Sequence, residues 1–325
     1  MLLAVSWPGM TVIAAAEQID QPDDVAAMEV ATDSAGAADR SHRPGTPNFG
    51  MKLIAWAAAL AVAVVFLRRR WHRFPRGRER DAAGPITIPL GLAMILLMYV
   101  LGPVGAYFLS QFQPPPPEDS PPEQRLAWQT MARLAAYALQ LLVVVWYARV
   151  WAAWPRSDRD RRRPGAVHAA VLGAATLALW YPAMYVTGII AAFAQEKIQG
   201  APVQAIAHAT LKELAESEAG LTRWMTILLA VLAAPIIEET MYRGLLQRTL
   251  AAAGQGPWVR IVLTSMVFAL FHINVAQPYA LAALFVLSLG FGWVFERTGR
   301  IIAPIAMHMV FNALNVILLF TMPAS

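Results

Sequence analysis

The stretch that decides the fold runs from Trp224 to Leu246 and reads WMTILLAVLAAPIIEETMYRGLL. Its length and apolar character are those of a membrane-spanning helix, yet two adjacent glutamates, Glu238 and Glu239, interrupt it. One carboxylate at the centre of a bilayer costs roughly 2.5–3.5 kcal/mol on insertion scales. Two neighbouring carboxylates also repel each other, so at least one of them needs a proton, a cation or hydrogen-bond donors.

The residues around the two glutamates predict different surroundings for them. Arg243 follows Glu239 by four residues, which places it one turn along the same helix face as an ion-pair partner. Glu238 lies about 100° round the helix and has no local cation. Pro235 is expected to kink this helix and to free a backbone carbonyl just before the acids. A carboxylate without a partner in an apolar place is a candidate general base, and Glu238 is that candidate.

The composition predicts an all-α integral membrane protein. The chain has 325 residues, of which 58% are hydrophobic and only 14% charged, and its mean hydropathy is +0.47. A soluble protein would carry about 25% charged residues. The absence of cysteine excludes disulfides, thiolate zinc sites and cysteine nucleophiles. The net charge of +5 comes from basic residues in short loops, so we expect a lipid bilayer and not nucleic acid as the partner.

The apolar runs predict about eight membrane-spanning helices around an intramembrane polar cavity. Each run approaches the roughly 17–25 residues that a span needs. The runs are 51–67, 87–110, 129–152, 166–193, 224–247, 259–275, 278–296 and 301–320. The short connection from Asn274 to Pro278 predicts that the sixth and seventh runs form a helical hairpin.

These runs divide the chain into four parts. Residues 1–50 combine a leader or signal-like segment with an acidic tail that we expect to be disordered, and 51–200 hold about four spans. Residues 201–223 form an extracytoplasmic amphipathic segment, and 224–320 form a helical core that contains the two glutamates. The first sixteen residues fit either a cleaved signal peptide or a dispensable leader.

The arginines predict the orientation. They cluster in alternate loops, and each cluster falls on one side if the N-terminus is outside. The arginines in question are Arg68, Arg69, Arg70, Arg73, Arg76, Arg78, Arg80, Arg156, Arg159, Arg161, Arg162, Arg163, Arg248, Arg260, Arg297 and Arg300. We therefore expect a multi-pass protein of the cell (inner or plasma) membrane with both termini outside.

Polar residues within the last four spans fall at one membrane depth. At about 1.5 Å per residue, Glu238 lies about 15 Å from the inner arginines, and the histidines His272 and His308 lie at about 18 and 12 Å. His272 follows Phe268 by four residues, and Asn312 follows His308 at the same spacing. Independent structural residues have no reason to agree in depth, so we predict one buried site.

The residue types of this site suit peptide hydrolysis. A carboxylate and an imidazole can hold a water molecule and take its proton. A second imidazole and a carboxamide N–H can bind the oxyanion that forms. Alternatively, the carboxylate and two imidazoles of Glu238, His272 and His308 bind zinc with an open water position. The cofactor is therefore either none or zinc, and the usual one-helix zinc-protease signature is absent.

Three motifs resemble those of the CPBP intramembrane proteases, the CAAX-processing and bacteriocin-processing (Abi) family. They are Glu238-Glu239-x-x-x-Arg243, Phe268-x-x-x-His272 and His308-x-x-x-Asn312, and they occur in that order. The approach Gly299-Arg-Ile-Ile-Ala-Pro-Ile-Ala-Met-His308 is also similar, and the resemblance covers residues 224–320.

This resemblance implies an intramembrane endopeptidase, either glutamate-type or metal-dependent, acting on a membrane-associated protein or peptide. Glu238 and His272 would activate water, and His308 and Asn312 would stabilise the oxyanion. Glu239 and Arg243 would shape and neutralise the site. Tyr242, four residues after Glu238, and Phe268 are supporting residues.

Other interpretations remain open at this stage. A non-catalytic membrane scaffold or chaperone could keep the same fold, and a proton-coupled transporter could use intramembrane Glu and His as a relay. Asn312 could join two helices without touching a substrate. His42, His72, His168 and His208 fall in the tail, in loops or at span ends, so we expect them to be solvated.

The arginine loops generate a topology prediction. Reporter domains fused after Arg70 or Arg161 should face the cytoplasm, whereas fusions near Glu118 or at Ser325 should face outside. Alkaline phosphatase and green fluorescent protein fusions measure the two sides. A cytoplasmic C-terminus would mean that one span is miscounted.

Overall fold

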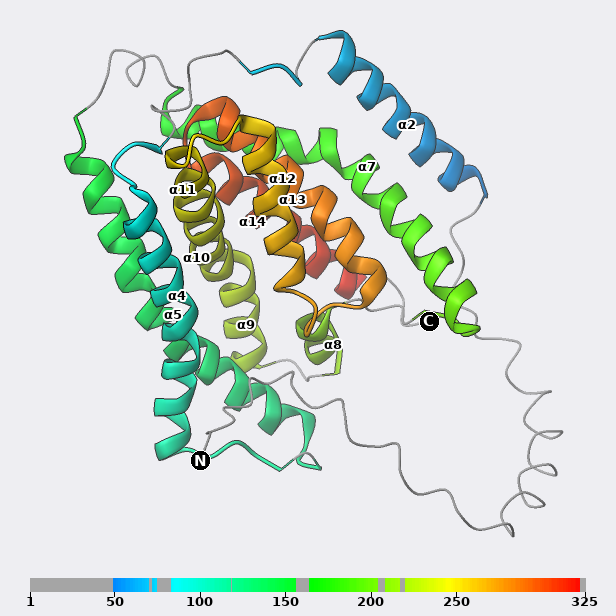
Figure 1. Ribbon diagram of the computed structural model, residues 1–325. Coiled ribbons are helices and arrows are strands. Elements are labelled where there is room, and N and C mark those ends of the chain that lie inside the picture. Colours follow the sequence, from blue (N-terminus) through cyan, green and yellow to red (C-terminus); the bar gives the residue numbers. More distant parts are fainter. Residues whose placement is uncertain are drawn as a thin grey trace, which may run out of the picture.

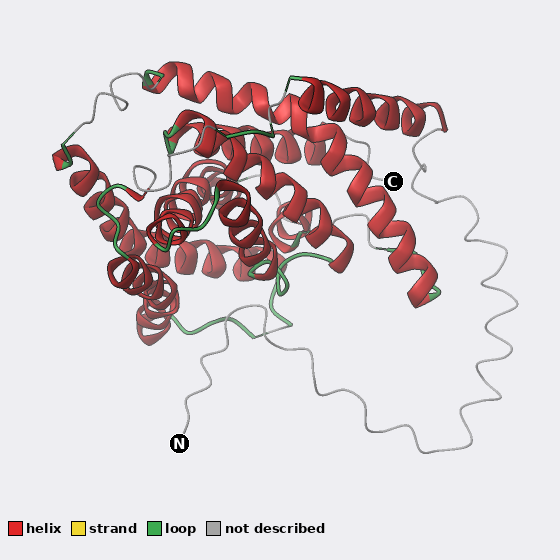
Figure 2. Cartoon of the chain, turned by 45° about the horizontal axis from the view of Figure 1, so that its top comes forward, coloured by secondary structure: helices red, strands yellow, loops and turns green. Residues whose placement is uncertain are grey.

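The computed structural model describes residues 49–69, 72–74, 83–117, 119–155, 164–203, 208–216 and 220–321. The expected leader and acidic tail lie outside these ranges, as do several arginines of the basic loops. Figure 2 shows that the regular elements of the described chain are helices, which confirms the all-α fold. The helices before the site are α2 (Phe49–Arg68), α4 (Ile88–Phe112), α5 (Pro122–Ala153), α7 (Ala166–Gln199) and α8 (Ala209–Glu216).

The fifth expected span is one helix of 32 residues, Leu221–Ala252, with two π-helical stretches inside it. Its parts are α9 (Leu221–Leu228), η1 (Leu229–Ala233), α10 (Ala234–Glu239), η2 (Thr240–Leu246) and α11 (Gln247–Ala252). After it come α12 (Pro257–Leu270), α13 (Pro278–Thr298) and α14 (Ile302–Thr321). Figure 1 shows this composite helix in the middle of the bundle, with α4 and α5 on one side and α12 to α14 on the other.

Six helices of the described chain are long and apolar enough to cross a membrane. The remaining two expected spans are shorter: the apolar part of α2 covers Trp56–Phe66, and α12 has 14 residues. At about 1.5 Å per residue α12 reaches only about 21 Å, less than the roughly 30 Å of the hydrocarbon core. The multi-pass membrane fold is thus confirmed, while the number eight stays a prediction.

Two of the arginines that the sequence analysis assigned to the loops lie within helices. Arg248 lies in α11 and Arg260 in α12, and both are buried although the sequence placed them in loops. The Arg260 guanidinium donates to the Glu296 carboxylate of α13 at 2.8 Å. The Arg248 guanidinium lies 3.9 Å from the centre of the Trp151 ring. Their charges are satisfied by the protein, so they fix helix packing instead of marking a solvated loop.

The hairpin predicted for the sixth and seventh runs is present, but its first helix ends early. It ends at Leu270, and residues His272–Ala276 form consecutive turns before Pro278 starts α13. The backbone N–H of His272 donates to the Ala269 carbonyl, three residues back, which tightens and stops the helix. His272 therefore lies on a turn and not on a helix, contrary to the sequence prediction.

The bundle core is apolar and tightly packed around α13. Leu287, Phe291, Ile261, Ala303 and Met307 are fully buried there. Helix α7 crosses α14 at Gly173, where an added Cβ would lie 1.9 Å from the Ala303 carbonyl oxygen. Only glycine permits this approach, since that oxygen belongs to backbone and cannot turn aside.

This contact generates a stability prediction. Gly173→Ala should lower the free energy of unfolding by about 1–3 kcal/mol, because the new methyl must push α7 and α14 apart. The matched control on the same helix is Gly188→Ala, whose Cβ would meet Ala283 at an ordinary 3.6 Å. Alanine is the better helix former, so the control should be neutral or stabilising. Thermal unfolding in detergent measures both, and equal midpoints would contradict the prediction.

Candidate active site

The two glutamates lie at the C-terminal end of α10, a six-residue α-helical stretch between two π-helical stretches. A π-helical stretch holds one more residue per turn than an α-helix and is frequent at functional sites. The first, η1, ends at Ala233, and the N–H of the next residue, Ala234, donates to the Leu229 carbonyl five residues back. The acids are therefore held by a helix whose register changes on both sides of them.

The buried member of the acid pair is Glu239, and it is bonded on two sides. Its Oε1 accepts from Arg243 Nη1 at 3.1 Å, as the i, i+4 spacing predicted, and both side chains are fully buried. The same oxygen lies 3.0 Å from His308 Nδ1. Arg243 also donates to the backbone oxygen and the Oγ of Ser288. One carboxylate thus joins the composite helix to α13 and α14.

The other member, Glu238, faces His272 across a gap. Glu238 Oε2 and His272 Nε2 lie 4.0 Å apart, too far for a direct hydrogen bond. Glu238 Oε2 is buried and has no hydrogen-bond partner among the described residues. The two side chains keep 26% and 15% of their exposure, whereas Glu239 and Arg243 keep none. The Glu238 and His272 side chains are therefore the accessible part of the site.

The tautomer of His272 follows from the bond that its ring makes at the C-terminal end of α12. Its Nδ1 lies 2.7 Å from the Phe268 carbonyl, which is left free because the His272 backbone N–H bonds to Ala269. A carbonyl can only accept, so Nδ1 carries the proton. In the neutral ring Nε2 is then an acceptor, and it is this atom that faces Glu238.

Asn312 is held by a carbonyl that the composite helix cannot use itself. The Ala234 N–H donates to Leu229 O, and the next residue, Pro235, has no N–H. The Ala230 carbonyl therefore receives no backbone N–H from the residue four positions later or from the residue five positions later. Asn312 Nδ2 donates to it instead, at 2.8 Å. The freed carbonyl that Pro235 predicted is present, and it ties α14 to the composite helix.

Phe268 and Tyr242 pack around the site. The Phe268 ring centre lies 4.5 Å from the His272 ring centre and 5.1 Å from that of Tyr242. The Arg243 guanidinium lies 5.2 Å from the centre of the same Phe268 ring. Phe268 is 1% exposed and separates the ion pair of Glu239 from the gap beside Glu238. Seven of the eight residues singled out in the sequence are thus connected through contacts of α10, η2, α12, α14 and the turn after α12, and Asn312 of α14 bonds to the Ala230 carbonyl.

Sequence reasoning missed one histidine near the site. His208 was expected to be solvated, but it is half-buried and its ring centre lies 6.3 Å from that of His272. A backbone bridge pairs His208 with Ala276, so the chain before α8 adheres to the turn after α12. Neither spacing nor hydropathy could reveal this, because the two segments are far apart in sequence and the contact is a single bridge.

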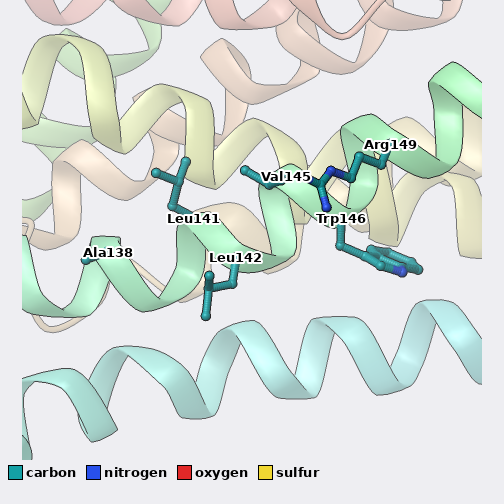
Figure 3. A pocket seen from close by; sticks show the side chains of 6 residues that line it. All are labelled: Ala138, Leu141, Leu142, Val145, Trp146 and Arg149. Atoms are coloured by element: carbon teal, nitrogen blue, oxygen red, sulfur yellow. The ribbon is translucent and has the colours of Figure 1, made fainter.

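Two cavities lie on the sides of the bundle. One, of about 200 Å³, lies between α4 and α12 and is lined by Tyr242 and Phe271 together with apolar side chains. The other, of about 310 Å³, runs along α5 and contains none of the site residues, as Figure 3 shows. Its lining is mostly leucine, valine and tryptophan, with Arg149 at one end. Such an apolar face in a membrane protein suits contact with lipid.

Residues 220–314 match the family model described as type II CAAX prenyl endopeptidase Rce1-like. This match confirms the resemblance that the three motifs predicted, over the segment that contains all eight site residues. No curated protein and no solved structure matches the chain. The Rce1-like segment supports a CAAX-type intramembrane protease and names the CAAX branch, not the bacteriocin-processing one.

The zinc alternative needs three donors that converge, and the Rce1-like segment does not supply them. Among the described residues no group of three His, Asp or Glu side chains is arranged to hold a metal ion. Glu238 and His272 face each other, but no third His, Asp or Glu side chain among the described residues joins them as a donor. The donor set predicted for zinc therefore does not fit this arrangement.

The buried ion pair generates a second stability prediction. Glu239→Gln leaves the fully buried Arg243 charge with a weakened partner, which should cost about 3–5 kcal/mol of unfolding free energy. Adding Arg243→Met should recover part of that loss, because the unpaired charge is then removed as well. Unfolding midpoints and folded yield in detergent report both variants.

The control is Glu213→Gln, which weakens the partly exposed Arg133–Glu213 pair. Exposed pairs contribute about 0–1 kcal/mol, so the control should unfold close to the unchanged protein. A Glu239→Gln protein as stable as this control would contradict a structural role for the buried pair.

Proposed function

We propose that this protein is an intramembrane endopeptidase in which Glu238 and His272 activate the attacking water. The observation that carries the proposal is the gap between two acceptors, Glu238 Oε2 and His272 Nε2, which lie 4.0 Å apart beside the cluster of Glu239, Arg243 and His308. Each atom can accept one hydrogen. A single water molecule that donates to both satisfies the buried oxygen of Glu238 and is held for reaction.

The distance suits such a water. Two hydrogen bonds of about 2.8 Å from one oxygen, opened at the angle of a water molecule, reach acceptors about 4–4.5 Å apart. Both hydrogens are then directed into the protein, and a lone pair of the oxygen points away from it. A carbonyl carbon placed on that side meets a nucleophile that is already oriented.

The reaction balances with these two residues. As the water oxygen bonds to the substrate carbonyl carbon, its proton passes to the Glu238 carboxylate, with His272 Nε2 holding the second hydrogen. The carbonyl electrons move onto oxygen and form a tetrahedral oxyanion. When the C–N bond breaks, the protonated Glu238 returns the proton to the leaving amine. The products are a carboxylic acid and an amine, and Glu238 is again ionised.

Asn312 and His308 are the proposed oxyanion donors, and their existing hydrogen bonds determine how many N–H groups each can still donate. Asn312 Nδ2 has two hydrogens, and one of them is used on Ala230. His308 donates Nδ1–H to Glu239, which only accepts, so its Nε2 is a donor only in the doubly protonated ring. Glu239 and Arg243 hold His308 in place and keep the remaining charge of the site buried and paired.

The substrate is proposed to be a membrane-associated protein or peptide. The Rce1-like match describes prenyl endopeptidases, whose substrates end in a lipidated C-a-a-X sequence. A scaffold without activity would need the Glu239 cluster for its fold, but it has no need for an unpaired, accessible carboxylate beside an imidazole. We therefore favour the protease over the scaffold and over a proton-coupled transporter.

The decisive test is Glu238→Gln. The amide keeps the volume but cannot take a proton, so cleavage should fall by well over about 100-fold. The purified protein in detergent is offered a peptide library prepared from its own membrane fraction and a farnesylated C-a-a-X peptide. Mass spectrometry counts the new termini.

The matched control is Glu123→Gln, in the first turn of α5 and far from the site in sequence, which should cleave at the unchanged rate. Normal cleavage by Glu238→Gln would sink the proposal and favour a scaffold. A folded, inactive Glu239→Gln together with an active Glu238→Gln would exchange the roles of the two acids.

A further inference from the structure

His208 is held next to the proposed catalytic pair by backbone contacts. It forms an antiparallel bridge with Ala276, and the Ala209 N–H donates to the Val275 carbonyl at 2.9 Å. Both partners belong to the turn that begins at His272. The ring centres of His208 and His272 lie 6.3 Å apart as a result. The turn thus places the two imidazoles side by side at the outer end of α12.

The proton on the His208 ring can be assigned from its one hydrogen bond. The backbone N–H of Thr210, in the first turn of α8, donates to His208 Nδ1 at 3.2 Å. Nδ1 is therefore an acceptor, and the neutral ring carries its proton on Nε2. No hydrogen-bond partner for Nε2 lies among the described residues. His208 accordingly has two separable functions: Nδ1 caps α8, and Nε2–H is available as a donor.

The surroundings of His208 keep this ring uncharged. Burial lowers its pKa from 6.5 to about 4, with further lowering from the nearby His272 and Arg133. Because the pKa is lowered, the ring is neutral at every pH well above 4. The Nε2–H donor therefore does not depend on protonation, unlike Nε2 of His308.

The oxyanion site has a corresponding shortage of donors. Asn312 has one hydrogen left after its bond to Ala230, and neutral His308 has none. Acyl transfer is helped by several donors directed at the developing oxyanion. A neutral imidazole next to His272 can supply one of them without adding a charge to the membrane.

We propose that His208 is a further substrate-binding residue of the site, whose Nε2–H donates to the substrate carbonyl as negative charge develops on it. The inference rests on the proposed peptidase function. It assigns a role to a residue that lies before the segment matched by the family model.

Two substitutions separate the donor function from the capping function. In His208→Asn the side-chain oxygen can accept from Thr210 in place of Nδ1, but no group reaches the position of Nε2. In His208→Gln an amide N–H reaches towards that position, while the cap is lost. His208→Ala, which lacks both groups, is the reference. If Nε2–H acts as a donor, His208→Gln should be more active than His208→Asn, and His208→Asn should be as slow as His208→Ala. If His208 only caps α8, His208→Asn should be more active than His208→Gln, and His208→Gln should be as slow as His208→Ala.

The measurement uses the fastest-cleaved peptide of the library, synthesised with a fluorophore and a quencher. His208→Asn should lower kcat by on the order of 100-fold with little change in KM, as for loss of one oxyanion donor. His208→Gln should retain at least a tenth of the unchanged kcat. Unfolding midpoints of both variants are recorded, and the ratio of their kcat values decides the matter even if one is less stable.

Three results would overturn the inference. Unchanged kcat in His208→Asn shows that Nε2 does not act in the reaction. The order Asn above Gln assigns His208 to capping α8 alone. If cleavage is absent, or if Glu238→Gln cleaves as fast as the unchanged protein, the proposed function fails and this inference fails with it. If cleavage depends on Glu238 but the His208 variants cleave at the unchanged rate, only the inference fails.

Discussion

The Glu239–Arg243 ion pair is the interaction on which the rest of the site depends. A carboxylate and a guanidinium that are both fully buried are tolerable only if nearly every lone pair and hydrogen has a partner. The partners come from Ser288 on α13 and His308 on α14, so satisfying the pair requires three helices at fixed positions. The rings of Phe268 and Phe291 lie 5.2 and 5.1 Å from the guanidinium and help to exclude water from it.

Two adjacent carboxylates can serve different purposes because a helix directs them to different sides. Glu239 points into the cluster and is neutralised there. Glu238, one residue earlier, points to the gap opposite His272, where nothing else among the described residues bonds its Oε2. The buried charge of Glu239 is thus paired with Arg243, and Glu238 keeps an oxygen without a hydrogen-bond partner among the described residues.

Much of this arrangement could be read from the sequence, and the exceptions have physical causes. The i, i+4 spacing predicted the Glu239–Arg243 pair, and the common depth of Glu238 and His272 predicted that these two side chains lie near each other. The partner of His308 could not be predicted, because side-chain pairing between helices depends on their rotation. The early end of α12 could not be predicted either, since it depends on the bond of the His272 N–H to Ala269 and on the His272 ring, which takes the freed Phe268 carbonyl. His208 was missed because a single bridge leaves no periodic signal.

The number of residues in the π-helical stretch η1 sets the rotation of the composite helix beyond it. Each residue turns an α-helix by about 100°, so one residue more or fewer in Leu229–Ala233 would rotate everything beyond it by that angle. On one side of the stretch Thr226 bonds to Thr130 of α5 at 2.6 Å, and on the other side stand the two acids. The contacts on the two sides of η1 can therefore both form only when the stretch has its present length. A change in the length of η1 therefore requires that the contacts on both sides of the stretch be repacked together.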